Sequence, residues 1–113
     1  MGFTVWHFRT EKGNTPTQDF LAKLKDEDAA GAIVADIELI AEHGPKAPAS
    51  MRPVTAWLPI WEIRTGVYRT MYVLAARAMW VLEICHKRDE KRGYALAWKR
   101  WKVVGEWLRG QGK

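Results

Sequence analysis

Residues 61–74 read WEIRTGVYRTMYVL, with apolar side chains alternating with charged or polar ones on both sides of a Thr-Gly pair. This alternation predicts two strands joined by a two-residue turn at Thr65 and Gly66, which sets Glu62 opposite Arg69. One face of this hairpin then carries mainly aromatic and aliphatic side chains. The opposite face carries Glu62, Arg64, Val67, Arg69 and Met71.

Two arginines beside one carboxylate make a poor core and predict a concave polar site. The alternative is a cross-strand ion pair between Glu62 and Arg69 on a solvated face, which would contribute about 0.2–1 kcal/mol. That alternative leaves Arg64 without a role.

Further elements are predicted on both sides of the hairpin. A third strand over 78–85 follows at hairpin distance, and a helix over 93–109 carries an apolar stripe of Tyr94, Ala97, Trp98, Trp101, Val104 and Leu108. Upstream, the segment 46–56 reads as a loop. The expected strands on either side of the turn are 57–64 and 67–74.

The N-terminal part reads as a strand followed by two helices. Residues 3–9 alternate β-branched and aromatic side chains, and Thr15-Pro16 opens a helix with a capping residue and a proline at its first position. The acidic stretch 26–28 suits the positive N-terminal end of a second helix, which Gly44-Pro45 ends. Its apolar stripe is Ala30, Ile33, Val34, Ile37, Ile40 and Ala41.

The predicted order is therefore β-α-α-β-β-β-α. It predicts an α+β fold in which an antiparallel sheet packs against an N-terminal helical hairpin and a C-terminal helix. With 113 residues and 48% hydrophobic content, we expect one domain over 1–113.

Composition excludes several function classes. No window approaches the roughly 18 apolar residues of a membrane span, and the N-terminus lacks a signal-peptide pattern, so we expect a cytoplasmic protein with no membrane partner. The single Cys85 has no partner for an intramolecular disulfide and none at metal-ligand spacing. We therefore expect no metal and no cofactor.

The positive charge is concentrated in residues 86–102, HKRDEKRGYALAWKRWK. This segment holds seven Lys and Arg against two Asp and Glu, whereas the other residues hold eleven of each. Such a local field attracts polyanions, of which nucleic acid is the commonest. A solvated helix face with surplus cations explains the same pattern equally well.

Three motifs, in this order and spacing, resemble the RelE/ParE toxin superfamily, and within it the HigB-like, phage-derived branch of type II toxin–antitoxin pairs. They are W-E-I-R at 61–64, Y-R-T-M-Y at 68–72, and the strand that runs into Lys87-Arg88. The resemblance covers almost the whole chain. One departure is Arg92-Gly93, where a Thr-Pro usually opens the last helix.

The resemblance implies a sheet with helices on one side and a basic concave face that binds messenger RNA, commonly on the ribosome. It matches Arg69 to the strand arginine that contacts the scissile phosphate, Lys87-Arg88 to the basic pair, and Tyr94 to a functional tyrosine. In cleavage by 2′-hydroxyl attack, arginines would stabilise the transition-state charge, and a base and an acid would move protons. The expected catalytic residues are Arg69, Arg64, Arg88, Tyr94, Glu62 and His86, with Glu62 as base and His86 or Tyr94 as acid. The expected RNA-binding residues are Lys87, Lys91, Arg92, Lys99 and Arg100.

Three functions stay open at this point. The first is a HigB-like endoribonuclease, ribosome-dependent and neutralised by a HigA-like antitoxin with a helix-turn-helix domain. The second is a ParE-like inhibitor of DNA gyrase, and the third is a non-catalytic basic module that binds nucleic acid. Fold analogy does not separate them, because function belongs to the site.

Overall fold

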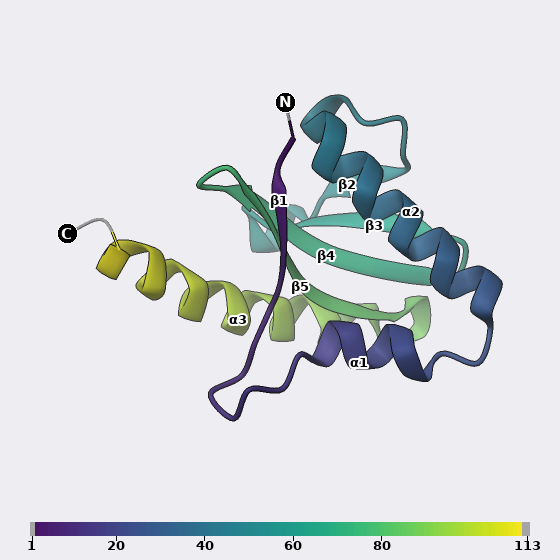
Figure 1. Ribbon diagram of the computed structural model, residues 1–113, viewed down its shortest axis with the longest axis horizontal. Coiled ribbons are helices and arrows are strands. Elements are labelled where there is room, and N and C mark those ends of the chain that lie inside the picture. The colour runs from purple at the N-terminus through teal and green to yellow at the C-terminus, as the bar shows by residue number, and fades with distance from the viewer. Residues whose placement is uncertain (1, 112–113) are drawn as a thin grey trace.

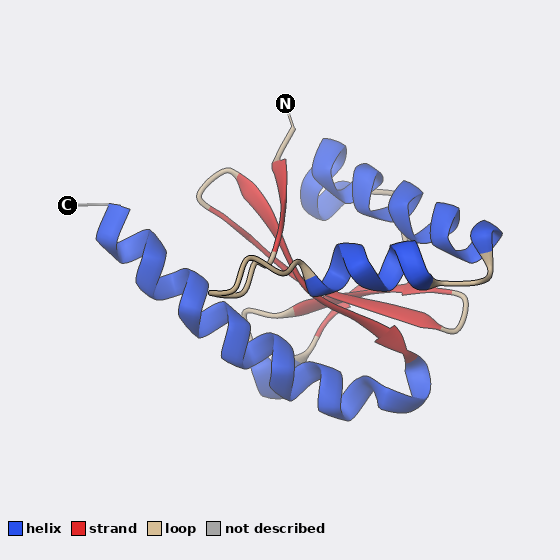
Figure 2. Cartoon of the chain, turned by 60° about the horizontal axis from the view of Figure 1, so that its bottom comes forward, coloured by secondary structure: helices blue, strands red, loops and turns tan. Residues whose placement is uncertain are grey.

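The computed structural model describes residues 2–111, which form one mixed sheet with α-helices packed against both faces (Figures 1 and 2). The elements in chain order are β1 (Thr4–His7), α1 (Pro16–Lys23), α2 (Glu27–His43), β2 (Met51–Pro53), β3 (Trp61–Thr65), β4 (Tyr68–Ala75), β5 (Ala78–His86) and α3 (Glu90–Gln111). Three short 3₁₀ turns join them: η1 (Gly44–Lys46), η2 (Thr55–Trp57) and η3 (Lys87–Asp89). The α+β class is confirmed.

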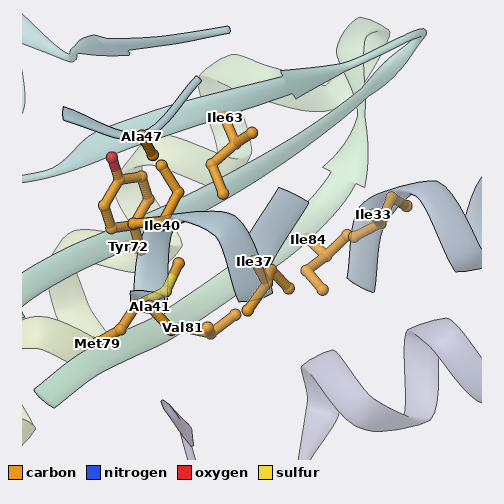
Figure 3. Packing of buried hydrophobic residues seen from close by; sticks show 10 residues of the cluster. All are labelled: Ile33, Ile37, Ile40, Ala41, Ala47, Ile63, Tyr72, Met79, Val81 and Ile84. Carbon is orange, nitrogen blue, oxygen red and sulfur yellow. The ribbon is translucent and has the colours of Figure 1, made fainter. Parts of the chain in front are cut away.

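The first core layer lies between α2 and the sheet (Figure 3). The predicted stripe of α2 supplies four of its buried residues, whereas Val34 at the margin of the stripe is 38% exposed. Apolar residues of α1 complete this layer from the side. The buried members are Ile33, Ile37, Ile40, Ala41, Ala47, Ile63, Tyr72, Met79, Val81 and Ile84.

The second core layer lies on the opposite face, under α3. The predicted apolar stripe of this helix is confirmed, with Ala97 and Val104 buried and its aromatic members packed around them. Helices therefore cover both faces of the sheet, and the expectation of helices on one side only is wrong. A sheet with apolar side chains on both faces has to be covered on both.

The sheet has the strand order β1-β5-β4-β3-β2. The expected antiparallel sheet is wrong in one respect, because β1 pairs with β5 in parallel. The strand count also differs from the prediction: β2 is a fifth strand inside the segment 46–56 that reads as a loop. β2 is only three residues long and ends in a proline, so it has no periodicity to detect.

The β3–β4 hairpin turns one residue later than predicted. Thr65 pairs with Tyr68, so the two turn residues are Gly66 and Val67. Gly66 has a φ of 57°, the positive angle that the first central residue of a type II′ turn requires.

This later turn changes the cross-strand partners but not the faces. The predicted pairing of Glu62 with Arg69 is wrong, because Glu62 lies opposite Met71 and Arg64 lies opposite Arg69. The partner of Glu62 shifts by two residues along β4. Because side chains alternate with period two, each keeps its predicted face.

Other boundaries differ by a few residues. The strand expected from residue 57 begins at Trp61, after η2 and a cis Leu58-Pro59 bond, and the last helix begins at Glu90 rather than at 93. No helix within 2–111 is both long enough and apolar enough to cross a membrane.

Candidate functional site

Three adjacent strands bring charged side chains together on the α3 face of the sheet. Arg52 of β2 lies directly opposite Glu62 of β3, and Arg64 lies opposite Arg69 of β4. Arg64 follows Glu62 by two residues, so all four side chains project from the same face. Tyr94, in the first turns of α3, reaches this group from the helix.

The carboxylate of Glu62 is the centre of the group and is fully buried. Arg52 donates a short hydrogen bond from Nε to Oε2, and the Tyr94 hydroxyl donates to Oε1 at 2.9 Å. The Nε atoms of Arg64 and Arg69 lie 3.8 Å from Oε2 and 4.0 Å from Oε1. We call these five residues the Glu62 cluster.

The three arginines of the Glu62 cluster differ in exposure. The side chain of Arg69 is 12% exposed, whereas those of Arg52 and Arg64 are 50% and 40% exposed. The Nε atoms of these two accessible guanidiniums approach the same buried oxygen, Oε2 of Glu62. A guanidinium has five N–H donors, so each still has donors to offer. Paired guanidiniums of this kind match the geometry of a phosphate or carboxylate anion.

Arg69 is tied to the protein on several sides. Its Nη1 donates to the carbonyl oxygens of Gly66 and Tyr68, both at 2.9 Å, and its Nε lies 3.5 Å from Oε2 of Glu90. The Nε atom is buried and has no hydrogen-bond partner among the described residues. Arg69 therefore contributes positive charge from below the surface, and the first contact of an anion falls to the other two arginines.

Tyr94 is held as a neutral hydroxyl. Burial, reinforced by the hydrogen bond to Glu62, raises the pKa of Tyr94 to about 12, although the nearby Arg52 acts in the opposite direction. The hydrogen bond of Arg52 to Glu62, and to a lesser extent its contact with Tyr94, raises the pKa of Arg52. At neutral pH the site therefore offers fixed positive charge and one phenolic proton.

His86 and Arg88 lie apart from the Glu62 cluster. His86 pairs with Tyr68 in the sheet register, so its ring lies on the α1 and α2 face, where it packs edge-on against Tyr68 at 5.7 Å. Arg88 in η3 is 76% exposed, and its Nε lies 4.0 Å from Asp89. The structure thus separates these two expected catalytic residues from the other four.

The five expected RNA-binding residues fall into two groups, four that are exposed and one that makes internal contacts. Lys87, Lys91 and Lys99 are exposed, and Arg92, which is 83% exposed, contacts Asp89 at 3.3 Å. Arg100 is only 14% exposed: its Nη1 donates to the Leu82 carbonyl and to Glu83, and its guanidinium lies over the Phe8 ring. Arg100 is therefore committed to internal contacts.

Sequence reasoning missed Arg52 and Glu90. Arg52 lies in β2, within the segment 46–56 that the sequence predicts to be a loop, and the only local signal is an arginine next to a proline. Glu90 begins a helix that was expected to start three residues later. Both residues enter the site through pairings between segments distant in sequence, which local periodicity does not reveal.

The Glu62 cluster combines three guanidiniums, one carboxylate and one phenolic hydroxyl. Within residues 2–111, no group of three or more His, Cys, Asp or Glu side chains is placed to hold a metal ion. In comparisons with known proteins, no protein-family model matches the chain, and no curated protein matches it.

Proposed function

We propose that this chain is a HigB-like toxin of the RelE/ParE superfamily that cleaves messenger RNA, with the Glu62 cluster as its phosphate site. What supports this most is one observation: a fully buried carboxylate gathers two half-exposed arginines and a tyrosine hydroxyl. The resemblance of the W-E-I-R and Y-R-T-M-Y motifs agrees with it, since these motifs supply three of the five residues. The added strand β2 supplies the fourth.

Each residue of the cluster receives a role in this proposal. Arg52 and Arg64 hold the non-bridging oxygens of the phosphate and stabilise the charge that grows on them in the transition state. Arg69 adds to the positive electrostatic potential at the phosphate from its buried position below the surface. Glu62 is a positioning residue: its burial and bound oxygens keep it from the substrate, and it fixes the orientation of the two arginines.

The reaction is a transfer of phosphorus from one oxygen to another. The ribose 2′-hydroxyl loses its proton to solvent and its oxygen bonds to phosphorus, while the bond from phosphorus to the 5′-oxygen breaks. In this step the Tyr94 hydroxyl exchanges its hydrogen bond to Glu62 for one to the departing oxygen, gives that oxygen its proton and regains one from solvent. The products are a 2′,3′-cyclic phosphate and a 5′-hydroxyl end. A phenol with a pKa of about 12 is protonated at neutral pH and can act as this acid.

The proposed partners follow from the same resemblance. We propose that the chain acts on messenger RNA at the ribosome and that a HigA-like antitoxin with a helix-turn-helix domain neutralises it.

The test is expression of Arg64→Ala and Tyr94→Phe variants, with the exposed Arg9→Ala as matched control. Brief induction is followed by growth measurement and by mapping of 5′-hydroxyl ends in cellular transcripts. Wild type and Arg9→Ala should arrest growth and cut transcripts, and each cluster variant should lower cleavage by about 10² or more. Thermal unfolding of the purified variants checks that they fold.

Three results would overturn the proposal or the part of it that concerns the site. Growth arrest with DNA breaks and intact transcripts would identify a gyrase inhibitor of the ParE kind. Binding of nucleic acid with neither cleavage nor arrest would identify a basic binding module. Full cleavage by a folded Arg64→Ala variant would remove the Glu62 cluster from the reaction.

A further inference from the structure

A hollow lies near the Glu62 cluster, on the other side of η3. It is an open pocket of about 550 Å³ between α1 and α3, closed at its base by the last residues of β5. This volume falls in the range of roughly 300–1,000 Å³ that is usual for small-molecule sites. None of the roles proposed above uses it.

The inner wall of the pocket is apolar. It includes Phe20 of α1, Leu24 directly after that helix, Leu96 of α3 and Tyr68 of β4. The Tyr68 ring meets Phe20 edge-on at 6.1 Å and His86 edge-on at 5.7 Å, so three rings line one side of the pocket. A flat apolar ligand fits such a wall.

The rim of the pocket is basic and accessible. Arg88 and Arg92 are 76% and 83% exposed, and both approach Asp89, which reduces but does not cancel their charge. Glu83, the other carboxylate of the lining, accepts a hydrogen bond from Arg100. Lys87 in η3 and Lys91 at the start of α3 add positive charge nearby, and with Asp89 and Glu90 they line a second open hollow of about 510 Å³.

Only the short turn η3 lies between this pocket and the Glu62 cluster. Asp89 lines the pocket, and the next residue, Glu90, contacts Arg69 of the cluster. The backbone N–H of Lys87 donates to the carbonyl of Val67 at 2.7 Å, which fixes η3 against the β3–β4 turn. A chain bound at the cluster reaches the pocket by crossing this one turn.

We propose that this pocket holds one unpaired RNA base, with the adjoining phosphate on Arg88 and Arg92. An aromatic wall beside a cationic rim is the usual arrangement for binding single-stranded nucleic acid, because each nucleotide joins a flat base to an anion. An apolar anchor of a protein partner would have no use for the two arginines. The identification of the occupant as RNA rests on the proposed function. In that case the pocket selects which base lies near the cleaved bond.

The first experiment measures binding of adenosine 5′-monophosphate to the purified wild-type chain by amide chemical shifts. Shifts should appear in α1, the end of β5 and the start of α3. Arg92→Glu should weaken binding by about tenfold, the loss expected for one charge-assisted contact, and Arg109→Glu in the last turns of the same helix should not.

The second experiment fills the pocket with Leu24→Trp and maps the bases beside the cleavage sites. Cleavage should continue with an altered base preference. Because Arg92→Glu and Leu24→Trp act through different walls, a folding failure of the tryptophan variant still leaves the binding measurement.

The outcomes separate the two proposals. Cleavage by wild type without nucleotide shifts at the pocket would overturn the base pocket and leave the nuclease. Nucleotide binding at the pocket without any cleavage would overturn the nuclease and support the pocket. Equal binding of adenosine without phosphate would overturn the role of the arginine rim and indicate an apolar anchor site.

Discussion

Glu62 shows how a single buried charge organises a site from several elements. A carboxylate withdrawn from water stays ionised at a tolerable cost only where hydrogen bonds and opposite charges replace the solvent. Its donors come from β2 and α3, and further positive charge comes from β3 and β4. The carboxylate thus couples the positions of four elements, and the arginines that face solvent are oriented before any ligand arrives.

His7 is a second residue whose environment has a measurable consequence. Its ring is half-buried, its Nδ1 lies 2.6 Å from the hydroxyl oxygen of the fully buried Thr17, and burial lowers its pKa. Between that lowered value and the unfolded value of about 6.5, the unfolded chain binds more protons than the folded one. The free energy of unfolding should therefore fall as the pH falls through this window, by at most about 1.4 kcal/mol per pH unit.

Urea unfolding between about pH 7 and about pH 5 tests the effect, which the His7→Gln variant should remove. The matched control is His43→Gln, which replaces a histidine that is 47% exposed at the end of α2. It should keep the wild-type pH dependence. A constant difference between wild type and His7→Gln at every pH would contradict the prediction.

At the scale of elements, Gly93 governs how closely α3 approaches the sheet. A Cβ atom at this position would lie 2.9 Å from Sγ of Cys85 and 3.1 Å from Cε of Met71, and both side chains are buried. We expect Gly93→Ala to lower the free energy of unfolding by about 1–2 kcal/mol, because overpacking outweighs the gain in helix propensity. Urea unfolding at neutral pH measures it.

Gly31 in α2 is the matched control, since a Cβ there would meet no atom within 4 Å. Gly31→Ala should raise stability by up to about 1 kcal/mol, the difference in helix propensity between the two residues. Destabilisation by both substitutions, or by neither, would show that contact with Met71 and Cys85 does not set the helix position.

These elements also show where reading the sequence succeeds and fails. The apolar stripes of α2 and α3 are predictable because the residues that recur at helical spacing are the ones that are buried. The faces of β3 and β4 are predicted correctly despite the wrong register, because the register shifts by two residues. The three residues of β2 and the parallel pairing of β1 depend on segments far away in the chain. Arg52 is not predicted for the same reason. The residues predicted for the site therefore lack the arginine that lies closest to Glu62.

At the scale of the whole molecule, α1 and α2 cover one face of the sheet and α3 covers the other, and η3 joins the last strand to α3. The sequence shows the basic segment 86–102, but it does not show that its cations lie in three different environments. Part of it turns inward at Arg100, part lines the pocket, and part flanks the cluster at the start of α3. Charge counting finds the segment that attracts a polyanion, and only packing decides which cations stay available.

The available cations should determine how binding depends on salt. Lys87→Glu with Lys91→Glu changes η3 and the start of α3, whereas Lys12→Glu with Lys46→Glu makes the same change of charge in the loop before α1 and in η1. All four lysines are exposed. Because each lost phosphate contact removes about 0.7 from the slope of log K against log salt for a single strand, the first pair should flatten the slope by about 1.4 and the second should leave it nearly unchanged. Titration of a short single-stranded RNA at several salt concentrations measures both slopes, and equal flattening by the two pairs would mean that net charge, rather than the surface around η3, attracts the RNA.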